Sequence, residues 1–301
     1  MRRFLRQTAV VPLLACLTAC GSDDEPFTAT KGSSLADQDN VRTWANGASA
    51  YAVYGEAYEP FAVADGEHTY ADPACPVVKD DGTTLTISGS CTDSTGEAWV
   101  GTATLVRAAN GDRALTLDGF GSETGGSSAT KTGDAHLRPI DDTSTDFDLD
   151  ITHEGGLVTT FAYTGRIQGG YTGRTVWNGS GTVTRDGVLE PTGSVDVTTT
   201  DEVIDNDVCS GQPLSGNTTL TNEAGETVVV TYDGAVDCDD DQAASYSLDG
   251  KPKGKITGIA CALAPGQAGT GGNCLLVVAL AGLLSTLRRR ARRPLHARRV
   301  A

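Results

Sequence analysis

The chain has few of the residues on which most enzymes and metal sites depend. Its 301 residues include four histidines and one methionine, and no two cysteines are spaced as in the CxxC motif of zinc and redox sites. The GxSxG and HExxH patterns of serine hydrolases and zinc proteases do not occur either. We therefore predict no catalytic residue, no cofactor and no metal site, and we do not expect an enzyme.

Basic residues are scarce between the two ends of the chain. Three of the 23 lie in residues 1–19 and seven in residues 288–301, which leaves 13 basic residues against all 39 acidic residues in the body. A body with this charge repels nucleic acid and anionic lipid surfaces. We expect no nucleic-acid partner, and the charge favours basic partners or divalent cations.

The N-terminus has the pattern of an export signal. Three arginines precede a short apolar run at Thr8–Leu17, which is shorter than the roughly 20 residues that a membrane-spanning helix needs. The run ends in Leu17-Thr18-Ala19-Cys20, which resembles the lipobox of bacterial lipoproteins. The resemblance implies cleavage before Cys20, lipid attachment to its thiol, and anchoring in the bacterial cell envelope, at the periplasmic face of the outer membrane or the cell surface. The alternative is an ordinary signal peptide with an incidental cysteine.

The C-terminus carries a second signal. Gly271 and Gly272 precede an uncharged run, Cys274–Leu287, and then an arginine cluster. As a helix this run would measure about 21 Å, which is short of the roughly 30 Å of a bilayer core. The pattern resembles sorting tails of the Myxo-CTERM and GlyGly-CTERM type, which implies recognition and cleavage by a membrane protease. Pro294–Ala301 extends past the usual end of such tails. A short membrane helix and a buried or disordered tail are the alternatives.

The body has the pattern of a mainly β, single antiparallel domain: a meander, a curved sheet or a barrel-like sandwich. Segments that alternate apolar and polar residues, such as Ser194–Thr198, indicate strands with one buried and one exposed face. Asp-Gly and Asn-Gly pairs suit tight hairpin turns. We expect such turns at Asp65-Gly66, Asp81-Gly82, Asn110-Gly111, Asp118-Gly119, Asn178-Gly179, Asp186-Gly187, Asp233-Gly234 and Asp249-Gly250.

One segment has helical spacing. Between Ser34 and Tyr58, Val41, Trp44 and Tyr51 recur at helical intervals, which predicts an N-terminal helix capped by Ser34 and packed on the sheet. An irregular aromatic loop is the alternative. The expected organisation is a signal peptide (1–19), a lipidated flexible tether (20–33), the β-domain with its helix (34–262), a Gly-rich linker (263–273) and the sorting or membrane tail (274–301).

The cysteines of the body predict two disulfides, because an exported protein meets oxidising conditions. Cys75 and Cys91 flank the turn at Asp81-Gly82, and Cys209 and Cys238 flank a turn signal at residues 222–225. We predict both pairs as clamps of hairpins. Cys261 would be free or pair with Cys274.

Other residue clusters have simpler interpretations. Asp146, Asp148 and Asp150 alternate as on the solvated face of a strand, although the spacing resembles the start of a calcium loop. A second acidic cluster surrounds Cys238. We expect His68, His136 and His153 to be separate surface or turn residues. We expect Trp99 and Trp177 to pack in the core, and Tyr163 and Tyr171 to begin two repeated Tyr-Thr-Gly-Arg segments that lie on successive strands.

Three functions fit these features. The first is a non-catalytic structural or interaction protein of the envelope, held to the membrane by lipid on Cys20 and by the tail, with an unidentified protein or envelope partner. The second is a carrier of a lipid or another apolar ligand, in which a curved sheet and a helix enclose the ligand as in lipoprotein-sorting half-barrels. The third is a polysaccharide hydrolase with paired carboxylates, for which the sequence gives no defined pair.

Overall fold

The computed structural model describes residues 34–124, 127–169, 173–187, 191–232, 234, 244–256 and 259. Cys20, Cys238, Cys261, Tyr171, the cluster at Asp237 and Asp239–Asp241, and both terminal signals lie outside the described residues. The predictions for them remain predictions.

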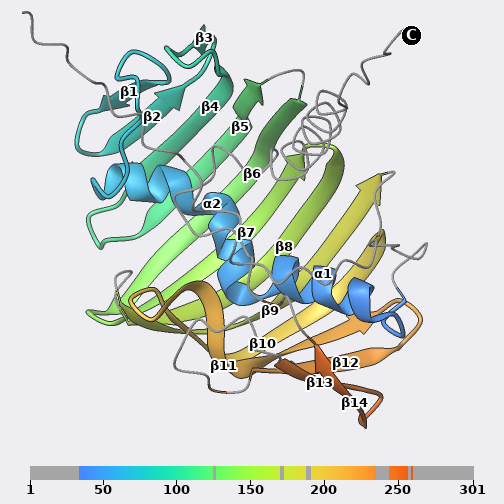
Figure 1. The fold of residues 1–301 in the computed structure, drawn as a ribbon. Helices are drawn as coiled ribbons and strands as arrows, with labels where there is room; N and C mark the ends of the chain where they lie inside the picture. Colours follow the sequence, from blue (N-terminus) through green and yellow to red (C-terminus); the bar gives the residue numbers. More distant parts are fainter. Residues whose placement is uncertain are drawn as a thin grey trace, which may run out of the picture.

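The described residues form one antiparallel sheet of fourteen strands, joined as a meander, with two helices before it (Figure 1). The strands follow one another in chain order across the sheet, except that the short β3 pairs only with β4. This architecture confirms the predicted mainly β domain with an N-terminal helical segment. The elements are α1 (Gln38–Ala48), α2 (Ala50–Ala64), β1 (Val77–Asp80), β2 (Thr84–Ser88), β3 (Cys91–Thr92), β4 (Ala98–Arg107), β5 (Arg113–Thr124), β6 (Ser127–Asp141), β7 (Ser144–Glu154), β8 (Leu157–Gln168), β9 (Arg174–Gly187), β10 (Gly193–Asp205), β11 (Cys209–Asn222), β12 (Thr227–Thr231), β13 (Ala244–Leu248) and β14 (Lys251–Ile256).

The sheet is curved, and both helices lie across its concave face (Figure 1). Helix α2 contacts β4 and β7 to β10, while α1 contacts β11. Along β7, for example, Phe147, Leu149 and Ile151 are buried in the core that the helices share, while Asp146, Asp148 and Asp150 alternate with them on the convex face. Neither helix has the length and apolar character needed to cross a membrane, as judged over the described part of the chain.

The helical segment consists of two helices where the spacing predicts one. Its cap is Asp37, whose carboxylate accepts hydrogen bonds from the amides of Asp39 and Asn40, whereas Ser34 lies outside the helix and its hydroxyl lies 3.4 Å from Glu226. The chain is extended at Ser49, which ends α1 and caps α2 by accepting from the amide of Ala52. Helix α2 then continues to Ala64, six residues beyond the predicted end.

The N-terminus of α2 is buried against β10. The amide of Ala50 donates to the Thr199 hydroxyl (2.9 Å), and the amide of Tyr51 donates to the Glu202 carboxylate (3.3 Å). These contacts satisfy first-turn amides that the helix itself leaves free. Burial raises the pKa of Glu202 to about 7, against the opposing effect of hydrogen bonds from Ser49 and Tyr51.

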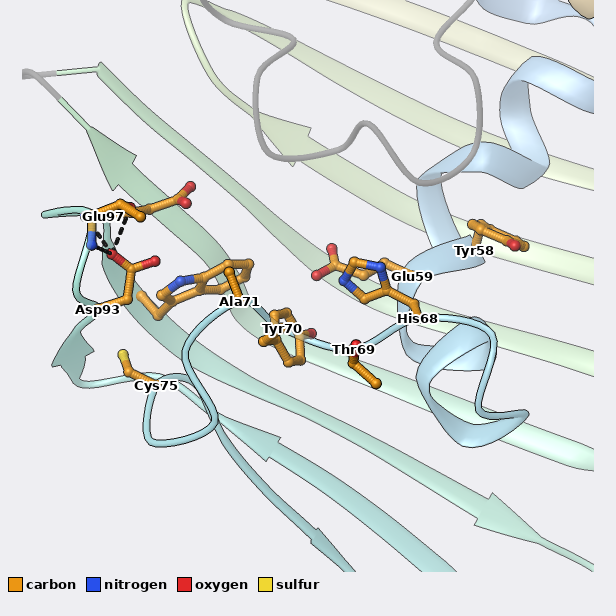
Figure 2. Close-up of a pocket in the computed structure, with 11 residues that line it drawn as sticks. Tyr58, Glu59, His68, Thr69, Tyr70, Ala71, Cys75, Asp93 and Glu97 are labelled. Carbon is orange, nitrogen blue, oxygen red and sulfur yellow. Dashed lines mark hydrogen bonds between the residues drawn. The ribbon is translucent and has the colours of Figure 1, made fainter. Parts of the chain in front are cut away.

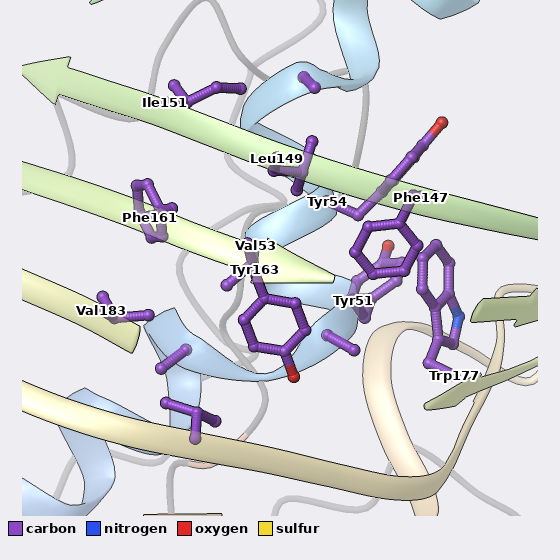
Figure 3. Packing of buried hydrophobic residues seen from close by; sticks show 14 of the residues in the cluster. Tyr51, Val53, Tyr54, Phe147, Leu149, Ile151, Phe161, Tyr163, Trp177 and Val183 are labelled. Carbon is purple, nitrogen blue, oxygen red and sulfur yellow. The ribbon is translucent and has the colours of Figure 1, made fainter. Parts of the chain in front are cut away.

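Aromatic side chains from both layers fill the space under α2 (Figure 3). The ring of Tyr54 lies 5.5 Å from Phe147 and 5.3 Å from Trp177, and Tyr51 meets Trp177 edge to face at 5.3 Å. Trp177 is 1% exposed and Tyr163 is 2% exposed, which confirms that Trp177 packs in the core. Such aromatic pairs contribute about 0.5–1.5 kcal/mol each beyond the area they bury.

Four of the predicted hairpin turns are found and three are wrong, one of them being Asp65-Gly66, which ends helix α2 and does not join two strands. Tight connections occur at Asp81-Gly82, Asn110-Gly111 and Asp249-Gly250, and at residues 222–225 between β11 and β12. Asp118-Gly119 instead forms a bulge inside β5, where Gly119 has φ +57° and the register shifts. Asn178-Gly179 lies in the middle of β9, where a Cβ at position 179 would collide with the ring of Tyr163 on β8, so the glycine makes room for that ring. These glycines therefore serve bending and close packing within strands.

We predict that Glu202→Gln changes the pH dependence of stability. The folded state holds the Glu202 proton more tightly than the unfolded chain, so this group favours folding fully below its ordinary pKa of 4.5 and loses that effect as the pH rises through about 7. The neutral glutamine should make the protein more stable than the wild type at about pH 8, by up to about 3 kcal/mol.

Urea unfolding of both proteins at about pH 5 and about pH 8 measures this effect. Glu123→Gln, which changes an exposed carboxylate on β5, is the matched control. An identical pH dependence for Glu202→Gln and the wild type would contradict the prediction.

Candidate functional site

A pocket lies at the β1–β4 end of the sheet, between the end of α2 and the loop that joins β3 to β4 (Figure 2). Its volume is about 270 Å³. Helix α2, the segment after it and the β3–β4 loop all contribute to the wall. The lining residues are Tyr58, Glu59, His68, Thr69, Tyr70, Ala71, Cys75, Asp93, Thr95, Glu97 and Trp99.

One wall is a tight turn organised by Asp93. Its Oδ1 accepts hydrogen bonds from the amide of Thr95 (2.8 Å), the hydroxyl of Thr95 (2.7 Å) and the amide of Glu97 (3.0 Å). Gly96 allows the chain to reverse, with φ +90°. These hydrogen bonds, led by that from the Thr95 side chain, lower the pKa of Asp93. The turn fixes the position from which Glu97 extends.

The segment after α2 is tied to this turn at two points. Asp72 accepts hydrogen bonds from the amides of Ala74 and Ser94, both at 2.9 Å, and so joins the two loops. A disulfide joins Cys75 to Cys91, with the two Cα atoms 5.8 Å apart. This is the pairing that the sequence predicts around the Asp81-Gly82 hairpin, and the disulfide also borders the pocket.

The floor of the pocket is aromatic. Tyr70 meets Trp99 edge to face at 5.0 Å, and His68 meets Tyr70 in the same way at 5.2 Å. Trp99 is 9% exposed and rests on Phe120 with a ring separation of 5.8 Å. Trp99 therefore packs in the core as predicted, and it also lines the pocket.

Two carboxylates extend toward each other from opposite walls, Glu59 from α2 and Glu97 from the β3–β4 loop (Figure 2). Among the described residues, none that lines the pocket is a lysine or an arginine. Burial, and then the nearby Glu59 carboxylate, raise the pKa of the Tyr70 hydroxyl. The pocket is therefore acidic above an aromatic floor.

Three polar atoms in this wall are buried without a hydrogen bond of ordinary geometry to the described residues: the Tyr70 hydroxyl, Trp99 Nε1 and Glu97 Oε1. The Tyr70 hydroxyl faces Glu59, and Trp99 Nε1 faces Asp93 and contributes to the lowering of its pKa. For Glu97 Oε1, the described part of the chain supplies no hydrogen-bond partner. Buried polar atoms are usually paired with protein, water or a ligand, so Glu97 Oε1 marks a place where a hydrogen-bond donor fits.

The pocket does not have the donor set of a metal site. Within the ranges that the structure describes, no three His, Cys, Asp or Glu side chains converge as metal ligands would. The pocket offers hydrogen-bond acceptors on two walls and aromatic rings between them.

A second group of ionisable residues lies under the middle of α2. Glu56 contacts Lys131 Nζ at 3.0 Å and His153 Nδ1 at 3.2 Å. Burial raises the pKa of Glu56, but the charge of Lys131 and the contact with His153 more than offset this effect and lower it to about 2. His153 thus contacts Glu56 under α2, and its prediction as a separate surface residue is wrong. Because Lys131 neutralises Glu56, we assign this group of side chains to the docking of α2 on β6 and β7.

The other predicted residues lie away from the pocket. Asp146, Asp148 and Asp150 follow the convex face of β7, where Asp146 pairs with Arg166 and Asp148 with Arg138. Cys209 begins β11, while its predicted partner, Cys238, lies outside the described residues.

The sequence contained signals for the pocket that its analysis missed. Glu56 and Glu59 are the two charged residues of an otherwise apolar helix. In the structure Glu56 contacts Lys131 and His153, and Glu59 lines the pocket. Asp93-Ser94-Thr95-Gly96-Glu97 has the composition of a tight turn with a side-chain cap. Only the fold brings this turn opposite Glu59.

Comparison with protein-family models, with curated proteins and with solved structures finds no match.

We predict that the disulfide stabilises the pocket wall. The variant Cys75→Ser/Cys91→Ser frees a loop whose ends are 16 residues apart, which should lower the free energy of unfolding by about 3 kcal/mol. Urea unfolding of the variant and the wild type measures the loss. An equal free energy of unfolding in the two proteins would contradict it.

We also predict an acid-sensitive contribution from Glu56. Its folded pKa is lowered from 4.5 to about 2, so its stabilising effect is present above 4.5 and is lost as the pH falls toward 2. Glu56→Gln should reduce stability by up to about 3 kcal/mol at about pH 7, and by much less at about pH 3. Unfolding measured at both pH values tests this, and a difference that does not depend on pH would refute it.

Proposed function

We propose that this chain is an exported lipoprotein, anchored by lipid on Cys20, whose folded domain is a non-catalytic binding and interaction module of the cell envelope. The lipobox resemblance of Leu17–Cys20 and the excess of acidic residues support this proposal. The Cys75–Cys91 disulfide is compatible with an oxidising compartment. The observation that carries the proposal is that the concave face is closed by the helices, while an acidic pocket remains open at the end of the sheet.

The closed concave face argues against the carrier. A lipid carrier needs an apolar cavity large enough for its ligand, whereas the side chains that point inward here are packed against α1 and α2. Trp44, Tyr54 and Phe61 from the helices and Leu149 from the sheet are each 1% exposed. The space that a lipid would occupy is filled by the protein's own aromatic residues.

The pocket also provides a test of the alternative function, a polysaccharide hydrolase. Glu59 and Glu97 face each other across it, as the two carboxylates of a glycosidase do. Its volume of about 270 Å³ lies below the roughly 300–1,000 Å³ of ordinary ligand pockets, which suits one side chain or small solute and leaves little room for a polysaccharide. We therefore place the pocket in a recognition role.

We predict that Cys20→Ser abolishes lipid attachment. Without the thiol no diacylglycerol can be added, so the variant should lack the mass of the lipid and keep its signal peptide. Intact mass spectrometry and detergent phase partitioning of the full-length chain, expressed in a lipoprotein-processing bacterium, measure both effects.

Cys16→Ser is the matched control, because Cys16 lies inside the apolar run and should leave lipidation unchanged. A Cys20→Ser protein that carries the same lipid mass as the wild type would overturn the lipoprotein assignment. Release of reducing sugars from envelope polysaccharides by the wild type, abolished in Glu97→Gln, would overturn the non-catalytic role.

A further inference from the structure

We propose that the pocket between α2 and the β3–β4 loop binds a protonated primary amine, the alkylammonium group of a small amine or of a lysine side chain. This inference rests on the proposed function and names the chemical group that the binding module would take.

The first argument is charge. Glu59, Asp93 and Glu97 line the pocket, and the basic residues of the neighbouring strands are already engaged. Arg107 pairs with Asp80 at 2.8 Å, Arg113 pairs with Asp65 at 2.7 Å, and Lys131 pairs with Glu56 at 3.0 Å; these contacts lie outside the pocket lining. Among the described residues that line the pocket, His68 is the one basic side chain and none is a lysine or an arginine, so a bound ammonium would supply a positive charge beside Glu59 and Glu97.

The second argument is the number and kind of hydrogen-bonding atoms. An ammonium group has three donors and no acceptor. The pocket offers acceptors on different sides: the Glu97 carboxylate, whose Oε1 has no hydrogen-bond partner among the described residues, the Glu59 carboxylate on the opposite wall, and the oxygen of the Tyr70 hydroxyl. A quaternary ammonium has no N–H to give and would leave Glu97 Oε1 unpaired. A neutral sugar would pair these atoms but would leave the two carboxylates without a counter-charge.

The third argument is the aromatic floor and the size of the pocket. Tyr70 and Trp99 present ring surface beside the carboxylates, and cations are attracted to the faces of such rings. Their apolar surface also suits the methylene stem of an alkylamine. A volume of about 270 Å³ accommodates such a stem and its ammonium group.

The walls are held in place before any ligand arrives. Asp93 fixes the turn that carries Glu97, Asp72 joins this turn to the segment that carries Tyr70, and the Cys75–Cys91 disulfide closes the same loop. A preorganised site loses less entropy on binding, so a single ammonium group can bind with measurable affinity.

Titration calorimetry of the full-length chain in detergent tests the inference, with n-butylammonium as the probe. Tetramethylammonium, calcium and glucose are the comparison solutes. We expect saturable binding of n-butylammonium and at least about ten-fold weaker binding by Glu97→Gln and by Glu59→Gln, because each removes one charge-assisted hydrogen bond. Asp150→Asn, which removes an exposed charge on the convex face, should bind as the wild type does.

The two glutamate variants lie on different elements, so their agreement would not come from the misfolding of one loop; a thermal melt confirms that each is folded. Nα-acetyl-lysine amide distinguishes the two sources of the amine. Affinity equal to that of n-butylammonium would point to a lysine side chain of a partner, and much weaker binding would point to a small free amine.

Absence of saturable n-butylammonium binding would overturn the inference, as would equal affinity for tetramethylammonium, calcium or glucose. Weakening by Asp150→Asn as large as that by Glu97→Gln would also overturn it, because binding would then follow net charge. These results are independent of Cys20 lipidation, so amine binding can fail while the lipoprotein assignment holds, and the reverse.

Discussion

The buried junction between α2 and β10 is the contact on which the rest of the structure depends. Thr199 and Glu202 of the sheet receive the first amides of α2, so a helix end can lie inside the protein without unsatisfied donors. The carboxylate is itself buried, at 0% exposure, and this burial raises its pKa. Glu56 then holds the middle of the same helix to β6 and β7 through Lys131 and His153.

This docking decides which surfaces are left for function. With α1 and α2 against the concave face (Figure 1), the aromatic residues of the sheet and of the helices complete one closed core (Figure 3). The convex face carries the polar half of each alternating strand. The open, acidic space lies where α2 ends, so Glu59 is positioned opposite Glu97 by the same helix that closes the core (Figure 2).

The fold was predictable to the extent that it follows from local patterns. Alternation gave the antiparallel strands, and Cys75 and Cys91 could be paired because a recognisable turn lies midway between them. The turn predicted at Asn178-Gly179 was wrong, because Asn-Gly is also the sequence of a strand position where glycine makes room for the ring of Tyr163. The break at Ser49 and the place of Glu202 were not predictable, since both depend on contacts between residues about 150 positions apart. The pocket depends in the same way on chain segments that meet only in the folded protein.

Native-state hydrogen exchange of the full-length chain tests the closed core most directly. If α2 is a fixed part of the core, the amides of Val53 and Tyr54 should exchange only through the global unfolding that also exposes the amides of β7 to β9. Their protection should then equal that of these strands. Rapid exchange in α2 while the strands stay protected would contradict the account, because the helix would then open as a lid over a cavity.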